Sequence, residues 1–128
     1  MRPALAARAA AEGEAAASAR AAHPLRLLVA EDDRDMRELI GIVLRGIPGA
    51  AEVTMVENAV AAMDFMEDHP LAVLVTDLCM PGADGLALLR FARTHQPLAQ
   101  VLLVTGFATV DSAVAALKEG AFDYVQKP

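Results

Sequence analysis

The chain has 128 residues, 55% of them hydrophobic, and a formal net charge of −6. This length suits a single domain around one core. The net negative charge argues against direct nucleic-acid binding, which needs clustered Lys and Arg. The single cysteine, Cys79, excludes an intramolecular disulfide, and no apolar run approaches the ~20 residues that span a bilayer. We therefore expect a cytoplasmic protein without a membrane segment.

Residues 1–24 differ in composition from the rest of the chain. This stretch is rich in alanine, and Leu5 is its one large aliphatic residue. It therefore lacks an apolar stripe on which a helix could dock. We expect an Ala-rich extension that is frayed or disordered, followed by one domain over residues 25–128. An organelle-targeting peptide is the alternative, and Glu12 and Glu14 argue against it.

From Leu25 onward, strand and helix patterns alternate. Short apolar runs bounded by turn residues predict strands over residues 25–30, 51–56, 71–76, 101–104 and 122–126. Helical patterns follow the first four strands, and each has a candidate N-cap: Asp33 or Asp35, Asn58, Asp84 and Thr109. Strict alternation predicts an α/β fold, a parallel sheet with right-handed crossovers.

Apolar spacing also predicts which helix faces meet the sheet. For the first helix the apolar face is predicted at Met36, Leu39, Ile40, Val43 and Leu44. The fourth helix is predicted to run through Val110, Ala113, Val114 and Leu117, with Gly120 as its C-terminal stop.

The side chains that could take part in a reaction lie at the ends of the predicted strands. All parallel strands end at one edge of the sheet, which gathers the following residues there: Glu31, Asp32, Asp33, Asp77, Thr105 and Lys127. Converging carboxylates repel one another, and a hard divalent cation resolves this repulsion. An all-oxygen cluster suits Mg²⁺, whereas the lack of histidine there disfavours zinc.

A carboxylate, Mg²⁺, a hydroxyl and a lysine together form the set that phosphoryl transfer needs. Each residue alone has an ordinary interpretation: an acid can cap a turn, and a lysine can be a surface charge. Their joint occurrence at strand ends favours a functional site.

Four segments together resemble the receiver domain of two-component response regulators. They are Leu27-Leu-Val-Ala-Glu31-Asp32-Asp33-Arg-Asp-Met-Arg37, Val75-Thr-Asp77-Leu-Cys-Met-Pro81-Gly-Ala-Asp-Gly85, Val104-Thr105-Gly106 and Asp123-Tyr124-Val-Gln-Lys127-Pro128. The resemblance covers the chain from about Leu25 onward. It implies a flavodoxin-like, doubly wound five-stranded sheet of order 2-1-3-4-5 and a cis Lys127–Pro128 bond. Residues 105–120 further resemble receivers that control enhancer-dependent transcription activators.

The resemblance implies a role for each acid. Asp77 would accept a phosphoryl group from a phosphohistidine of a sensor histidine kinase or phosphotransfer protein. Glu31, Asp32, Asp77 and the backbone carbonyl of Cys79 would hold Mg²⁺, while Asp33 would start the first helix.

It also implies a switch. Thr105 and Lys127 would bind the phosphoryl oxygens, and Tyr124 would turn inward when Thr105 moves. The chain would then be a phosphoacceptor signalling domain with slow self-dephosphorylation rather than an enzyme. A weak homodimer through the fourth-helix and fifth-strand face would be compatible with this function.

The sequence departs from the receiver pattern at its C-terminal end, and two functions other than phosphoacceptor signalling are also considered. Receivers continue past Lys-Pro into a fifth helix, whereas this sequence ends at Pro128. We therefore expect a C-terminally incomplete domain with apolar surface exposed beside the first and fifth strands.

A Mg²⁺-dependent aspartyl phosphohydrolase is disfavoured because Asp77-Leu78-Cys79 lacks the second acid of an Asp-x-Asp pair. A non-switching interaction module is the other alternative.

Overall fold

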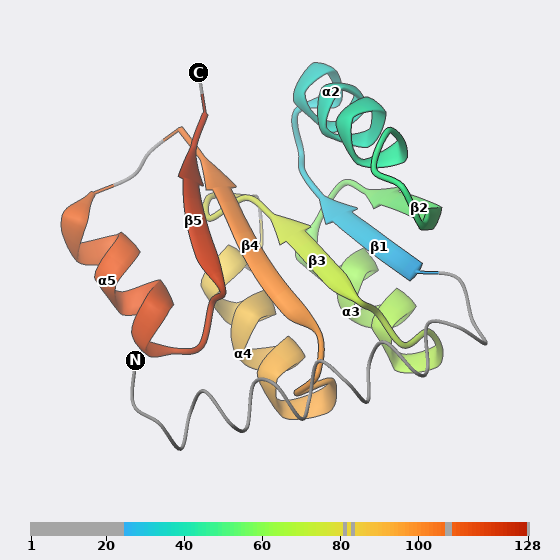
Figure 1. Ribbon diagram of the computed structural model, residues 1–128. Coiled ribbons are helices and arrows are strands. Elements are labelled where there is room, and N and C mark those ends of the chain that lie inside the picture. Colours follow the sequence, from blue (N-terminus) through green and yellow to red (C-terminus); the bar gives the residue numbers. More distant parts are fainter. Residues whose placement is uncertain (1–24, 81, 83, 107–108, 128) are drawn as a thin grey trace.

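The computed structural model describes residues 25–80, 82, 84–106 and 109–127. The predicted extension over residues 1–24 and the predicted cis bond before Pro128 lie outside these residues. Helix and strand labels follow Figure 1.

Five parallel strands form one sheet in the order β2-β1-β3-β4-β5 (Figure 1). The strands are β1 (Leu25–Ala30), β2 (Ala50–Val56), β3 (Val73–Thr76), β4 (Gln100–Thr105) and β5 (Asp123–Gln126). The predicted flavodoxin-like order is confirmed. The chain reverses its direction of travel across the sheet between β1 and β3, and such sheets place their sites beside this switch point.

Four helices connect the strands in the described part of the chain: α2 (Arg34–Arg45), α3 (Ala59–Asp68), α4 (Gly85–His95) and α5 (Val110–Lys118). Each starts at a predicted cap, where a side-chain oxygen accepts a bond from a backbone N–H of the first turn. The four caps are Asp33, Asn58, Asp84 and Thr109. At α5 the cap is reciprocal, because the Ser112 side chain also accepts a bond from the Thr109 N–H.

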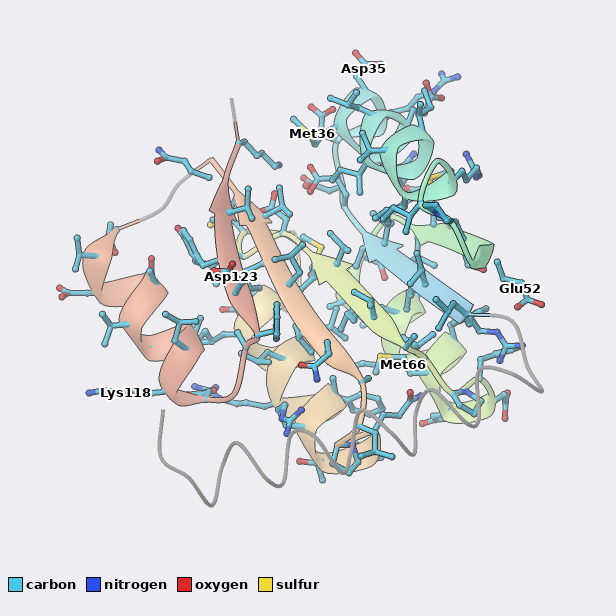
Figure 2. All side chains as sticks on the ribbon, in the orientation of Figure 1. Asp35, Met36, Glu52, Met66, Lys118 and Asp123 are labelled. Carbon is cyan, nitrogen blue, oxygen red and sulfur yellow. The ribbon has the colours of Figure 1, made fainter. Side chains whose placement is uncertain are left out.

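The sheet lies between two unequal helical layers (Figure 1). Helices α3, α4 and α5 line one face, and α2 lies on the other face over β1 and β2. The main core is between the sheet and the three-helix layer, where Leu28, Leu74 and Leu103 are fully buried. Met66 of α3 adds to this core (Figure 2).

The packing of α2 and α5 departs from the predicted helix faces. On α2, the predicted positions Leu39 and Val43 are exposed. The other predicted positions are partly buried and lie one helical turn apart: Met36, Ile40 and Leu44. On α5, the large residue Leu117 is exposed while Ala116 is fully buried. Alanine lets α5 approach the sheet closely, so the large apolar side chains of that helix face outward.

Apolar side chains are exposed near both strands named in the expectation of exposed apolar surface, the first and the fifth. Val125 of β5 is exposed, and so are Leu39, Ile42 and Val43 of α2, which packs on β1 and β2, whereas Leu27 and Val29 of β1 itself are buried. The third strand also starts later than predicted. Leu71 lies outside β3 because the Leu71 N–H donates to the side chain of Gln96 (2.7 Å) and not to a neighbouring strand. No helix in the described ranges is long and apolar enough to cross a membrane.

Candidate functional site

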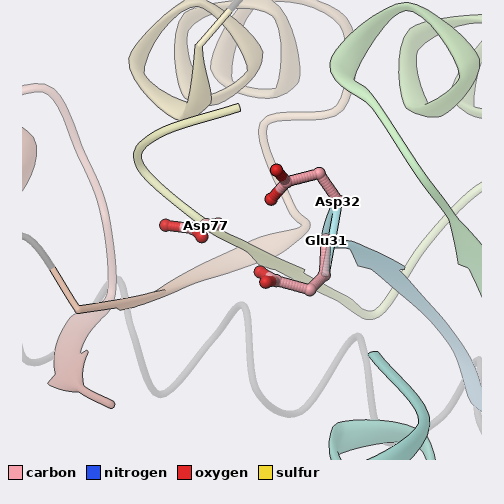
Figure 3. A group of neighbouring side chains, drawn as sticks. All are labelled: Glu31, Asp32 and Asp77. Carbon is pink, nitrogen blue, oxygen red and sulfur yellow. The ribbon is translucent and has the colours of Figure 1, made fainter. Parts of the chain in front are cut away.

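Three carboxylates meet at the switch point of the sheet (Figure 3). Glu31 and Asp32 directly follow β1, and Asp77 directly follows the neighbouring strand β3, where Ala30 pairs with Thr76. Their carboxylate oxygens lie within 4.8 Å of one another. Glu31 and Asp77 are almost fully buried, at 1% and 5% exposure, while Asp32 is exposed.

Lys127 joins two of these acids. It follows β5, and its N–H donates to the carbonyl of Thr105 at the end of β4 (2.9 Å). Its Nζ donates to Glu31 Oε1 and to Asp77 Oδ2, at 2.8 Å each. The prediction that the ends of the first, third and fifth strands converge therefore holds at the level of side chains.

Burial and charge act differently on the two buried acids. Burial, with repulsion from Asp77, raises the pKa of Glu31, although its bond from Lys127 acts in the opposite sense. For Asp77, burial also favours the neutral form, but bonds from Lys127, the Cys79 N–H and the Thr105 hydroxyl outweigh it and lower the pKa. Asp77 is therefore the better-stabilised carboxylate. Burial alone would lower the pKa of Lys127, and its two acidic partners raise it.

The loop that follows β3 fixes the position of Asp77 through backbone hydrogen bonds. The Cys79 N–H donates to Asp77 Oδ1 (3.2 Å), and the Gly85 N–H donates to the Leu78 carbonyl (2.9 Å). Gly85 starts α4 so close to this loop that a Cβ would collide with the Asp77 carbonyl oxygen and lie 2.8 Å from Leu78 Cα. A glycine is therefore required at this position by packing.

The donor set fits a hard divalent cation. Besides the three clustered carboxylates, Glu31 Oε2 is buried and has no hydrogen-bond partner in the described part of the protein. A buried carboxylate oxygen without a partner is costly, and a cation at the cluster would satisfy it. Oxygen ligands of this kind suit Mg²⁺ or Ca²⁺.

The remaining predicted residues lie around this cluster. Thr105 is fully buried at the end of β4, and Tyr124 of β5 packs partly buried against the core. The Tyr124 hydroxyl is buried and has no hydrogen-bond partner among the described residues. Asp33 caps α2 instead of joining the cluster (Met36 N to Asp33 Oδ1, 2.9 Å).

Sequence reasoning missed one residue at this site, Arg37. Its Nη1 donates to the backbone carbonyls of Glu31 (2.9 Å) and Asp32 (3.5 Å). Arg37 closes the first matched segment of the sequence, but an arginine on a helix gives no signal that it turns back to the preceding loop.

Fold and site together define a doubly wound sheet with an acidic cluster and a lysine at its switch point. The model of the response regulator receiver domain matches residues 27–128. The chain belongs to this family, and it is a receiver domain, a signalling domain of two-component systems.

Curated relatives are considerably longer than this chain, which spans about a fifth of their length. The response regulator protein FleR of Pseudomonas aeruginosa is 39% identical over 103 residues, covering 80% of this chain and 21% of FleR. The DNA-binding transcriptional regulator NtrC of Escherichia coli is 35% identical over 100 residues, covering 78% and 21%.

Solved structures agree with the fold. A response regulator from Burkholderia pseudomallei, with a phosphorylated aspartic acid, calcium ion and citrate, aligns with a TM-score of 0.74 and 29% identity, over 81% of this chain and 60% of that one. A receiver domain protein from Clostridium thermocellum gives a TM-score of 0.73 at 30% identity, over 81% and 82%. Receiver domains bind a metal at an acidic pocket, and the Burkholderia structure contains calcium.

Proposed function

We propose that Asp77 is the phosphoacceptor of this receiver domain and that its donor is a phosphohistidine of a sensor histidine kinase or phosphotransfer protein. The supporting observation is the environment of Asp77: a buried carboxylate with a lowered pKa, bonded to Lys127 and adjacent to two further acids. The phosphorylated aspartic acid of the Burkholderia relative is in accord with this assignment.

In the proposed reaction a carboxylate oxygen of Asp77 attacks phosphorus. A new O–P bond forms, the N–P bond of the phosphohistidine breaks, and the imidazole nitrogen keeps the electron pair. Lys127 lies 2.8 Å from Asp77 Oδ2 and would neutralise phosphoryl charge. Thr105, at the end of the adjacent strand, would donate its hydroxyl to a phosphoryl oxygen. Attack by water on the acyl phosphate would return Asp77 slowly to its free state.

Glu31, Asp32, Asp77 and the Cys79 carbonyl would hold the metal, which we propose to be Mg²⁺. When bound, it would neutralise negative charge on the phosphoryl oxygens and on the carboxylate cluster. The chain's own part is to keep three acids together: β1 and β3 set their spacing, and Lys127 offsets part of their repulsion.

We further propose that Tyr124 and Thr105 report the phosphorylated state. Phosphorylation adds about −1.5 to −2 charges beside Lys127, and Thr105 would move toward them. Tyr124 pairs with Leu103, which lies two residues before Thr105 on the neighbouring strand β4, so its ring would follow. The surface of α5 and β5 would then shift its population.

The test of Asp77 uses a small acyl phosphate or phosphoramidate with Mg²⁺, and mass spectrometry of the intact chain. Wild-type protein should gain one phosphoryl group, and Asp77→Asn should gain none. Asp84→Asn is the matched control: Asp84 lies in the same loop but caps α4, and asparagine preserves a cap. The control should label like wild type. Because Tyr124 is the only tyrosine and tryptophan is absent, tyrosine fluorescence reports the switch in the same samples.

Two results would contradict the assignment. Equal labelling of Asp77→Asn and wild type would place the phosphoryl group elsewhere. Turnover of a generic phosphate ester would instead favour the phosphohydrolase alternative.

A further inference from the structure

We propose that Arg37 is a positioning residue for the metal site, acting through the backbone of the turn that carries Glu31 and Asp32. The inference rests on the proposed function, because it takes a cation to bind at the three clustered acids. Arg37 does not touch the cation in this proposal. It sets the direction in which Asp32 presents its carboxylate.

The contacts of Arg37 are unlike those of a surface arginine. Its side chain is partly buried and donates to the carbonyls of Glu31 and Asp32. It forms no ion pair with any carboxylate in the described ranges. Arg34, one helical turn earlier, is the contrast: its side chain is 80% exposed and pairs with Glu38 at 3.2 Å.

The two carbonyls belong to the two peptide units on either side of the Asp32 Cα. Each peptide unit is planar, so the backbone has two free dihedrals at this residue. Holding both planes fixes these dihedrals and therefore the direction of the Asp32 side chain. The Arg37 N–H also bonds to the Asp33 carbonyl (2.9 Å), which ties the same turn to the start of α2.

Asp32 needs such support because its own side chain has none. Its carboxylate is exposed, and it accepts no hydrogen bond from the described residues. Glu31 and Asp77, in contrast, are held by Lys127. Without Arg37, Asp32 would leave the cluster through backbone rotation in the turn.

Charge alone makes the opposite prediction. A guanidinium near a cation site repels the cation, so removing this charge would tighten metal binding. Loss of positioning would weaken it, because supporting partners of metal ligands typically contribute tenfold or more to metal affinity. The sign of the change therefore separates the two effects.

The experiment is calorimetric titration of Mg²⁺ into the full chain. Arg37→Gln should raise the Mg²⁺ dissociation constant about tenfold although it removes a positive charge. Arg37→Lys should fall between this variant and wild type, because an ammonium keeps the charge but lacks the planar fork that reaches two carbonyls. Arg34→Gln should leave the constant unchanged.

Thermal unfolding without Mg²⁺ shows which variants are folded. Equal or tighter binding by Arg37→Gln overturns the inference, and if that variant does not fold, wild-type affinity in Arg37→Lys overturns it. These results leave the phosphoacceptor assignment intact. Absence of Mg²⁺ binding in wild type would remove the metal assignment and the role of Arg37 together.

Discussion

At the scale of single residues, Glu31 and Asp77 show how one lysine is shared between two buried acids whose pKa values shift in opposite directions. Lys127 bonds to both at the same distance, yet the pKa of Asp77 is lowered and the pKa of Glu31 is raised. The difference arises because Asp77 receives two further hydrogen bonds, from the Cys79 N–H and Thr105. Asp77 is thereby kept ionised, while the charge on Glu31 destabilises the metal-free fold.

This gives a prediction for Glu31→Gln. Burial and Asp77 raise the pKa of Glu31 above its ordinary 4.5, so the fold favours the protonated carboxyl group. The stability that this preference contributes is fully present below pH 4.5 and is lost as pH rises through the raised pKa, where Glu31 ionises. Metal-free Glu31→Gln should therefore melt at a higher temperature than wild type at pH 7, and the difference should shrink as pH is lowered. Mg²⁺ should raise the melting temperature of wild type more than that of the variant.

Differential scanning fluorimetry with and without Mg²⁺ measures both effects. Glu38→Gln, on the exposed side of α2, is the control and should behave as wild type. A lower melting temperature for metal-free Glu31→Gln at pH 7 would show that the bond to Lys127 outweighs burial.

The residue scale also shows the limits of sequence reasoning. Strand ends predicted which side chains gather, because parallel strands end at one edge, and Glu31, Asp77 and Lys127 do meet. The bond between Glu31 and Lys127 was not predicted, since it depends on side-chain reach across the sheet. The roles assigned to Cys79 and Tyr124 stay predictions.

At the scale of elements, the start of α4 determines the position of the loop behind Asp77. Gly85 lies against the Asp77 carbonyl, where a Cβ has no room. Gly85→Ala should destabilise the protein by about 1–3 kcal/mol, because overpacking forces the backbone to shift. Urea denaturation measures this loss. The same variant should also be phosphorylated more slowly by a small phosphodonor, because the displaced loop contains Cys79, whose N–H donates to Asp77.

Gly46→Ala is the matched control. Gly46 caps the end of α2 with a helical φ of −77°, and a Cβ there would come no closer than 3.4 Å to the Val43 carbonyl. The urea concentration at the unfolding midpoint of Gly46→Ala should stay close to that of wild type. Equal midpoints for Gly85→Ala and wild type would mean that α4 moves without cost.

Helix starts were predictable, and so were the buried faces of α3 and α4, where Met66 and Leu89 lie in the core. The faces of α2 and α5 were not. All four caps follow from a short polar side chain ahead of an apolar pattern, which is a local signal. Which face meets the sheet depends on how closely the helix approaches. Thus α5 packs through Ala116 and leaves Leu117 exposed, although apolar spacing favoured the larger residue.

At the scale of the whole molecule, the outward face of α5 offers a surface for self-association. Val110, Val114 and Leu117 are exposed on this helix, and exposed apolar patches commonly mark interaction sites. We expect a weak homodimer through α5 and β5. Leu117→Ser should weaken it at least fivefold, which corresponds to about 1 kcal/mol.

Sedimentation velocity over a range of concentrations measures this association. Ile42→Ser is the control, because Ile42 is similarly exposed but lies on α2, on the opposite face of the sheet. Equal dissociation constants for wild type and Leu117→Ser would exclude this surface. Weakening by Ile42→Ser alone would place the contact on α2.

The bond between Glu31 and Lys127 also has a consequence for biosynthesis. Its two residues are 96 positions apart, so Glu31 leaves the ribosome long before its partner exists. Caps such as Asp33 form from local sequence, whereas the counterion of Glu31 among the described residues is Lys127, which is in place only when β5 has joined the sheet. A nascent chain therefore cannot assemble the proposed phosphoacceptor site early, and a phosphodonor would meet this site only on a molecule whose translation has passed Lys127.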